Sequence, residues 1–121
     1  MKRIFFIQPL VEKLRSEHPP KVTFRTRRHH GTFAVYSGGR FHPRAEDIVI
    51  KVWSSGLIST ADLTDQDAQD AGLANLEELF GLFRRWYGDV PAKMFRNEFV
   101  IIEPKSAQVL PERKVKVGCL A

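Results

Sequence analysis

The 121-residue sequence has one cysteine, Cys119, and no long hydrophobic run. One cysteine cannot form an internal disulfide, so we expect a reducing compartment. No stretch approaches the about 18 consecutive apolar residues of a membrane-spanning helix. The apolar run near the N-terminus is short and is interrupted by Gln8 and Glu12, unlike a signal peptide. We therefore predict a cytoplasmic protein with no membrane partner, and no obligate protein partner is evident.

Acidic residues are scarce in the first third of the chain. Residues 1–45 carry ten Lys or Arg and two acidic residues, whereas residues 46–103 carry five basic and eleven acidic ones. Residues 104–121 carry four basic residues and one acidic residue. A cationic segment of this kind is typical of a surface that binds a polyanion. The alternative is a folded surface whose basic and acidic parts face each other.

The apolar pattern predicts more strands than helices. Strands are expected at residues 3–7, 21–26, 33–37, 47–53 and 95–102. A hairpin turn is expected at Gly38-Gly39, with a second arm around 40–42 that Pro43 ends. A further turn at 54–56 and a short strand at 57–60 complete the strand predictions.

Helices are predicted in three places. One starts at Pro9 and ends before Pro19-Pro20. A second is capped by Thr64 and a third by Asn75, each with acidic residues in its first turn. Because strands and helices do not alternate regularly, we predict an α+β fold: a small mixed β-barrel with two to three flanking helices. The predicted domain covers residues 1–104, followed by a basic tail at 105–121 with a short strand at 114–117.

Residues 21–31, KVTFRTRRHHG, contain no acidic residue. Strand alternation predicts Lys21, Thr23 and Arg25 on one exposed face, with the intervening apolar residues buried on the other. We expect Lys21 and Arg25 to contact phosphate and Thr23 to form hydrogen bonds to a nucleic acid. The alternative is an exposed face whose charges protect a sheet edge.

The residues that follow this strand are also basic. Arg27, Arg28, His29, His30 and, further along the chain, Arg40 are expected to attract a nucleic-acid backbone. The two histidines titrate near neutrality and are suited to acid–base work, although a solvated loop is the commoner role. Neighbouring histidines point apart on a strand and no third ligand has suitable spacing, so we predict no metal and no cofactor.

Four aromatic side chains are candidates for stacking on bases: Phe33, Tyr36, Phe41 and Trp53. Aromatic residues of a small barrel usually belong to its core. We therefore expect at most one of them to be exposed, and Tyr36 or Phe41, next to the Gly-Gly turn, are the expected ones.

Two stretches together resemble the ASCH-domain family, relatives of the RNA-binding PUA domains. They are KVTFR at 21–25 and LTDQDAQDAGLANLEELFGLFRRWYG at 63–88, and the resemblance spans roughly residues 4–103. It implies a PUA-like β-barrel with a cleft beside the 21–25 strand that binds RNA or a nucleotide-like ligand. The Gly-Asp turn that the family places before a central strand is replaced here by Glu46-Asp47.

Some members of this family are reported as ribonucleases, and others as amidases that act on acetylated cytidine through a Lys, Thr and Glu set. Thr23 matches the threonine of that set. The position of the lysine holds Pro20, with Lys21 beside it, and the position of the acid holds Ala71, with Asp70 beside it. The resemblance thus implies a degraded catalytic set of Lys21, Thr23 and Asp70. We predict an RNA- or nucleotide-binding module, with a hydrolase on the same cleft, either a ribonuclease or an N4-acetylcytidine-type amidohydrolase, as the alternative.

Overall fold

A computed structural model describes residues 1–39 and 41–103. Its elements follow the order β1 (Lys2–Phe5), α1 (Gln8–Leu14), β2 (Val22–Arg25), β3 (Gly31–Ser37), β4 (Arg44–Ser59), a 3-10 turn η1 (Thr60–Asp62), α2 (Asp65–Asp70), α3 (Leu76–Tyr87) and β5 (Lys93–Glu103). The expectations for Arg40, Cys119 and the tail at 105–121 lie outside the described residues. Within the described ranges, no helix combines the length and the apolar character needed to cross a membrane.

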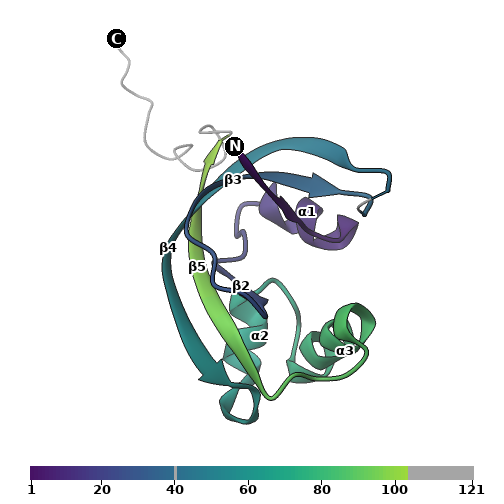
Figure 1. The fold of residues 1–121 in the computed structure, drawn as a ribbon, viewed down its shortest axis with the longest axis vertical. Helices are drawn as coiled ribbons and strands as arrows, with labels where there is room; N and C mark the ends of the chain where they lie inside the picture. The colour runs from purple at the N-terminus through teal and green to yellow at the C-terminus, as the bar shows by residue number, and fades with distance from the viewer. Residues whose placement is uncertain (40, 104–121) are drawn as a thin grey trace. The chain divides into compact units, whose positions relative to one another are not determined.

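The strands pair in the order β1-β3-β4-β5-β2 (Figure 1). β1 runs parallel to β3, whereas β2 runs antiparallel to β5, so the sheet is mixed. Three α-helices accompany this five-stranded sheet in the part of the chain that the structure describes. The predicted α+β class is confirmed at this level.

The chain is divided into two compact units. Among the described residues, the first unit comprises 1–19, 32–39, 41–51 and 101–103, and the second comprises 20–31 and 52–100. β4 and β5 are long enough to contribute residues to both units. The basic stretch from Lys21 to His30 belongs entirely to the second unit, as does Asp70, so the candidate site is described within that unit alone.

In the first unit, α1 buries the side chains of Leu10, Val11 and Leu14, and Pro9 occupies its first turn as predicted. β3 ends at the predicted Gly38-Gly39 turn, where both glycines have positive φ angles. A Cβ on Gly38 would clash with the carbonyl oxygen of His42, so the turn requires glycine there. The expected second arm around 40–42 is wrong in its described part. Residues 41–43 are not in a strand, and β4 begins after Pro43, because proline cannot donate to a strand ladder.

The core of the second unit lies between strands and the helices α2 and α3. The buried side chains of this core are Val22, Phe24, Leu63, Ala68, Ala71, Leu79, Phe83 and Met94.

The predicted helix caps of the second unit are confirmed. Thr64 accepts a hydrogen bond from the backbone N–H of Asp67, whose carboxylate in turn accepts from the backbone of Thr64. Asn75 accepts from the N–H of Glu78, and Gly88 ends α3 in the left-handed conformation. These caps satisfy backbone groups that a helix leaves unpaired at its ends.

The predicted turn at 54–56 is wrong, because β4 continues through it to Ser59. Pairing with the neighbouring strand β5 overrides the local turn preference of the Ser-Ser-Gly sequence. The continuation of β4 places Trp53, Ser55 and Leu57 on one face of the strand, since alternate side chains share a face.

Candidate functional site

β2 carries the first of the predicted site residues and pairs with β5. Thr23 lies opposite Asn97 and Arg25 lies opposite Phe95. The expected exposed face of Lys21, Thr23 and Arg25 is wrong at its centre, because the Thr23 side chain is only 6% exposed. Lys21 is exposed and Arg25 is half-buried. The backbone of Arg27 and of His29 contacts Asn97 on this face, so this strand face is not open to solvent along its length.

Arg25 is held between a hydroxyl and an aromatic ring. Its Nε donates a hydrogen bond of 2.9 Å to Oγ1 of Thr23. Its guanidinium carbon lies 4.9 Å from the centroid of the Trp86 ring, a cation–π distance. Burial lowers the pKa of Arg25 to about 10, against a smaller raising effect of Tyr87. Arg25 therefore remains a positive charge at neutral pH and is fixed in position by its neighbours.

Lys21 and Asp70 meet through the backbone. The N–H of Lys21 donates to the carbonyl oxygen of Asp70 over 2.7 Å, and the carbonyl of Lys21 accepts from the N–H of Phe99. The Asp70 carboxylate itself is engaged elsewhere: it accepts from Arg96 at 3.3 Å and from Gln66 at 3.1 Å. Ala71, at the position where the family resemblance implies an acid, lies in the core of this unit.

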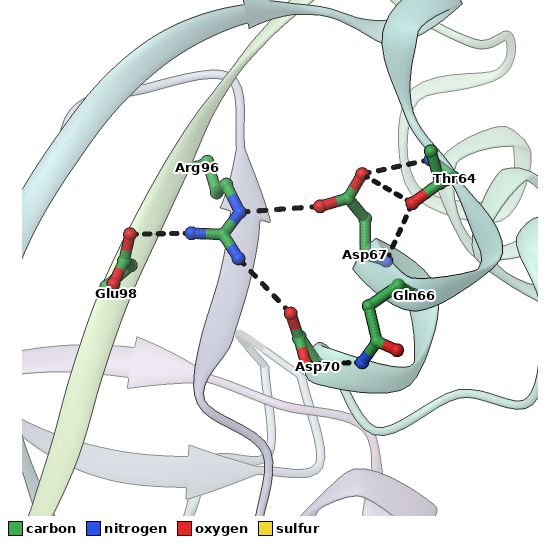
Figure 2. A network of polar contacts seen from close by, with 6 residues as sticks. All are labelled: Thr64, Gln66, Asp67, Asp70, Arg96 and Glu98. Atoms are coloured by element: carbon green, nitrogen blue, oxygen red, sulfur yellow. Dashed lines mark hydrogen bonds and ion pairs between the residues drawn. The ribbon is translucent and has the colours of Figure 1, made fainter.

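Arg96 is surrounded by three carboxylates (Figure 2). The distances from its guanidinium nitrogen atoms to the nearest carboxylate oxygen are 3.6 Å for Asp67, 3.3 Å for Asp70 and 2.6 Å for Glu98. Asp67 also closes the capping box of α2, so one side chain serves both the helix end and the ion pair. This network ties α2 to β5 and engages the Asp70 carboxylate with Arg96.

The basic stretch after β2 is fastened to a buried amide. Asn97 is fully buried, and its Oδ1 accepts from the backbone N–H of His29 over 3.0 Å. Its Nδ2 donates to the carbonyl oxygens of Thr23 at 3.3 Å and Arg27 at 3.5 Å. The hydroxyl of Ser55 donates to the same Oδ1 over 2.6 Å. We call residues 26–30 the basic loop, and Asn97 forms hydrogen bonds to the backbone of two of its residues, Arg27 and His29.

The side chains of the basic loop face outward from this anchor. Arg27, Arg28 and His30 are exposed and His29 is half-buried. Arg28 donates to the carbonyl oxygen of Ser55 over 3.3 Å, and its guanidinium carbon lies 5.2 Å from the centroid of the Phe95 ring. The Nδ1 of His29 lies 3.0 Å from the carbonyl oxygen of Arg27. The backbone is fixed while two guanidinium groups remain accessible.

The expectation for the aromatic residues is wrong for Trp53. Two of the four are exposed, Phe41 at 84% and Trp53 at 58%, whereas Phe33 is buried. Tyr36 is half-buried, with its ring 5.8 Å from that of Phe5. Trp53 is exposed because it lies on the outward-facing side of β4, opposite to the buried Val52.

The first unit contains a separate polar centre around Glu46, the first residue of the Glu46-Asp47 pair that replaces the Gly-Asp turn. Glu46 is only 7% exposed, and its carboxylate accepts from the hydroxyl of Ser37, from Arg15 at 3.1 Å and from Arg44 at 3.3 Å. The Ser37 hydrogen bond lowers the pKa of Glu46, with further lowering by Arg15 and Arg44 against the opposing effect of burial. The next residue, Asp47, has a φ of 58°, an uncommon conformation for a residue other than glycine.

The structure thus brings together Thr23, Arg25 and the basic loop on the second unit. The Asp70 carboxylate instead forms an ion pair with Arg96. Asn97 and Ser55 are the site residues that sequence reasoning missed. The available signal was the alternation in the strand sequence FRNEFVII, which places the polar Asn97 on the same face as the apolar Phe95 and Phe99.

Within residues 1–39 and 41–103, no group of three or more His, Cys, Asp or Glu side chains is placed to hold a metal ion.

Comparisons with known proteins do not assign the chain to a family. A scan against family models, a search of curated proteins and a search of solved structures each found no match. The similarity to ASCH domains therefore stays a prediction from the residues quoted above.

Proposed function

We propose that this protein is an RNA- or nucleotide-binding module that uses a cationic surface beside β2 and the basic loop. The mixed sheet with its helices is proposed to be a PUA-like barrel of the ASCH type. A cytoplasmic location, which the single cysteine favours, is part of the same proposal.

The observation that carries the proposal is the attachment of the basic loop to Asn97. The exposed guanidinium groups of Arg27 and Arg28 sit on a backbone that a fully buried amide holds in place. A loop fixed before binding loses less conformational entropy when it binds, so its charges are used more effectively. Solvated charges that only confer solubility need no such anchor.

Arg25 extends this surface along β2. Its charge is retained at neutral pH, and its contacts with Thr23 and Trp86 restrict its side chain. A guanidinium group binds phosphate through two parallel hydrogen bonds when it is correctly oriented. Lys21 adds an exposed charge at the start of the same strand.

The geometry favours binding over hydrolysis at the Lys21, Thr23 and Asp70 set. A nucleophilic hydroxyl requires access to substrate and a base that accepts its proton. The Thr23 hydroxyl is buried and accepts from Arg25, and the Asp70 carboxylate is held by Arg96. We therefore propose a binding module rather than an enzyme.

A fluorescence-anisotropy titration with a labelled 12-nucleotide RNA tests the proposal. At low salt we expect binding by the wild type and weaker binding when Arg27 and Arg28 are both changed to Ala. A parallel competition with a nucleoside monophosphate separates an RNA partner from a nucleotide-like ligand. Absence of binding to both RNA and nucleotide would overturn the proposal.

A further inference from the structure

β4 exposes two large apolar side chains beside the basic loop. Trp53 is 58% exposed and Leu57 is 55% exposed. Each lies two residues from Ser55, so all three project from the same face of β4. An exposed tryptophan next to a cationic loop offers a partner an aromatic face together with a positive charge.

Ser55 connects this face of β4 to the basic loop. Its carbonyl oxygen accepts from Arg28 at 3.3 Å, and its hydroxyl donates to Asn97 at 2.6 Å. Asn97 in turn accepts from the N–H of His29. The guanidinium group of Arg28 therefore lies against the strand residue that separates Trp53 from Leu57.

We infer that Trp53 stacks on an unpaired base of a single-stranded nucleic acid whose phosphates contact Arg27 and Arg28. This inference rests on the proposed function and adds to it the form of the nucleic acid and the residue that receives the base. An exposed indole offers an aromatic face to any base, and a neighbouring cation neutralises the backbone that joins successive bases. Bases within a duplex are already stacked on one another, so the surface selects single strands.

Charge complementarity favours a nucleic acid over a protein partner. The basic loop, which Arg28 joins to Ser55 of β4, carries two exposed guanidinium groups, and no acidic residue lies between positions 21 and 31 of the sequence. Protein interfaces place their aromatic anchors at a centre depleted of charge. Here the exposed tryptophan has a cationic loop as its neighbour, which fits a base joined to phosphate.

The test compares three single variants with the wild type. Trp53→Ala removes the stacking ring, Trp53→Phe retains a ring, and Phe41→Ala removes the other strongly exposed aromatic residue, which lies in the first unit. Each protein is titrated by anisotropy with a 12-nucleotide single-stranded RNA and with a duplex of the same sequence. Circular dichroism establishes that each variant is folded.

We expect Trp53→Ala to weaken single-strand binding at least about fivefold, because alanine substitution of a stacking aromatic residue costs about 1–3 kcal/mol per base. Trp53→Phe should recover most of the affinity, Phe41→Ala should bind like the wild type, and the duplex should bind more weakly than the single strand. Trp53 and Trp86 are the two tryptophans of the chain. In the Trp86→Phe background, which keeps an aromatic ring beside Arg25 and whose RNA affinity is measured alongside, quenching of the remaining tryptophan fluorescence by RNA should report stacking on Trp53 directly.

The outcomes separate this inference from the proposed function. Salt-dependent RNA binding that is lost with Arg27 and Arg28 but unchanged in Trp53→Ala overturns the role of Trp53 and leaves the binding function in place. A loss of affinity in Phe41→Ala instead also overturns it. A Trp53→Ala variant that changes oligomeric state while RNA affinity stays constant identifies the surface as a protein interface. Absence of nucleic-acid binding by the wild type overturns both the inference and the function.

Discussion

The backbone N–H of His29 donates to the side-chain oxygen of Asn97 across 3.0 Å, although 68 positions separate the two residues in the sequence. This hydrogen bond makes an exposed cationic loop depend on a residue in the middle of a distant strand. The position of Arg27 and Arg28 is therefore set by β5 as much as by their own segment.

Replacing Asn97 by Ala should loosen the basic loop. The change leaves the backbone N–H of His29 without its Oδ1 acceptor and removes the Nδ2 donor to the carbonyl oxygens of Thr23 and Arg27, which costs about 1–3 kcal/mol of unfolding free energy. Ser55→Ala is the matched control, because it removes one donor and leaves the Asn97–His29 hydrogen bond intact. Urea unfolding gives the stability change, and amide hydrogen exchange at His29 gives the local one. Equal exchange rates at His29 in Asn97→Ala and the wild type would show that Asn97 does not hold the loop.

Replacing Arg96 by Gln should destabilise the second unit in a salt-dependent way. Three carboxylates, those of Asp67, Asp70 and Glu98, then remain near one another without a cation. We expect a loss of about 1–3 kcal/mol at low salt and a smaller loss at high salt, because salt screens like-charge repulsion. Glu98→Gln, which leaves two of the three ion pairs, should cost less. Screening differs strongly between about 20 mM and about 500 mM salt. An equal loss of unfolding free energy at these two concentrations would contradict the electrostatic explanation.

We predict that Glu46 stabilises the fold at neutral pH and that this stabilisation is lost in acid. The pKa of Glu46 in the folded protein is lowered, chiefly by the hydrogen bond from Ser37. Because the folded pKa is lowered, the stabilising contribution of Glu46 is fully present above the pKa of the unfolded chain, about 4.3. The contribution is lost as the pH falls through the folded pKa. Urea unfolding between about pH 7 and pH 3 should therefore show a steeper acid-side decrease for the wild type than for Glu46→Gln. Parallel pH profiles for the two proteins would contradict this assignment.

Much of the local structure of the second unit could be predicted from the sequence. Thr64 and Asn75 cap their helices, and Gly88 ends α3, because these signals depend only on residues within one turn. The continuation of β4 through residues 54–56 could not be predicted in the same way. The continuation depends on pairing with β5, and a local sequence such as Ser-Ser-Gly does not indicate which strand will pair with it.

The candidate site shows the same division. The cationic character of the basic loop is visible in the residues, whereas its attachment to Asn97 requires a contact between distant segments. Strand alternation placed Thr23 and Arg25 on one face but gave no sign that the Thr23 side chain is buried. Trp53 was expected in the core because aromatic residues of a small barrel usually belong there, and its exposure follows from which face of β4 it occupies.

N4-acetylcytidine should be turned over very slowly or not at all. The Thr23 hydroxyl is buried and accepts from Arg25, the Asp70 carboxylate is bound by Arg96, and Ala71 carries no acid. Chromatographic measurement of deacetylation by the wild type and by Thr23→Ala checks this expectation. Robust turnover by the wild type that disappears in the variant would contradict it, and Asp70→Asn would then be the next variant to measure.

The salt dependence of RNA binding tests the central claim, that the anchored basic loop is the nucleic-acid contact surface. For single strands, the logarithm of the binding constant falls with the logarithm of salt concentration by about 0.7 for each phosphate contact. Changing Arg27 and Arg28 together to Ala should therefore weaken binding and reduce this slope by about 1.4. Arg84 and Arg85 are an exposed pair on α3 whose replacement by Ala changes the net charge equally. This control should leave the slope close to that of the wild type.

The decisive measurement is thus one set of anisotropy titrations across salt concentrations for the wild type, the basic-loop double variant and the α3 double variant. The account predicts that only the basic-loop variant shows both a weaker affinity at low salt and a shallower slope. Identical affinity and slope for that variant and the wild type, or the same change in both double variants, would contradict it.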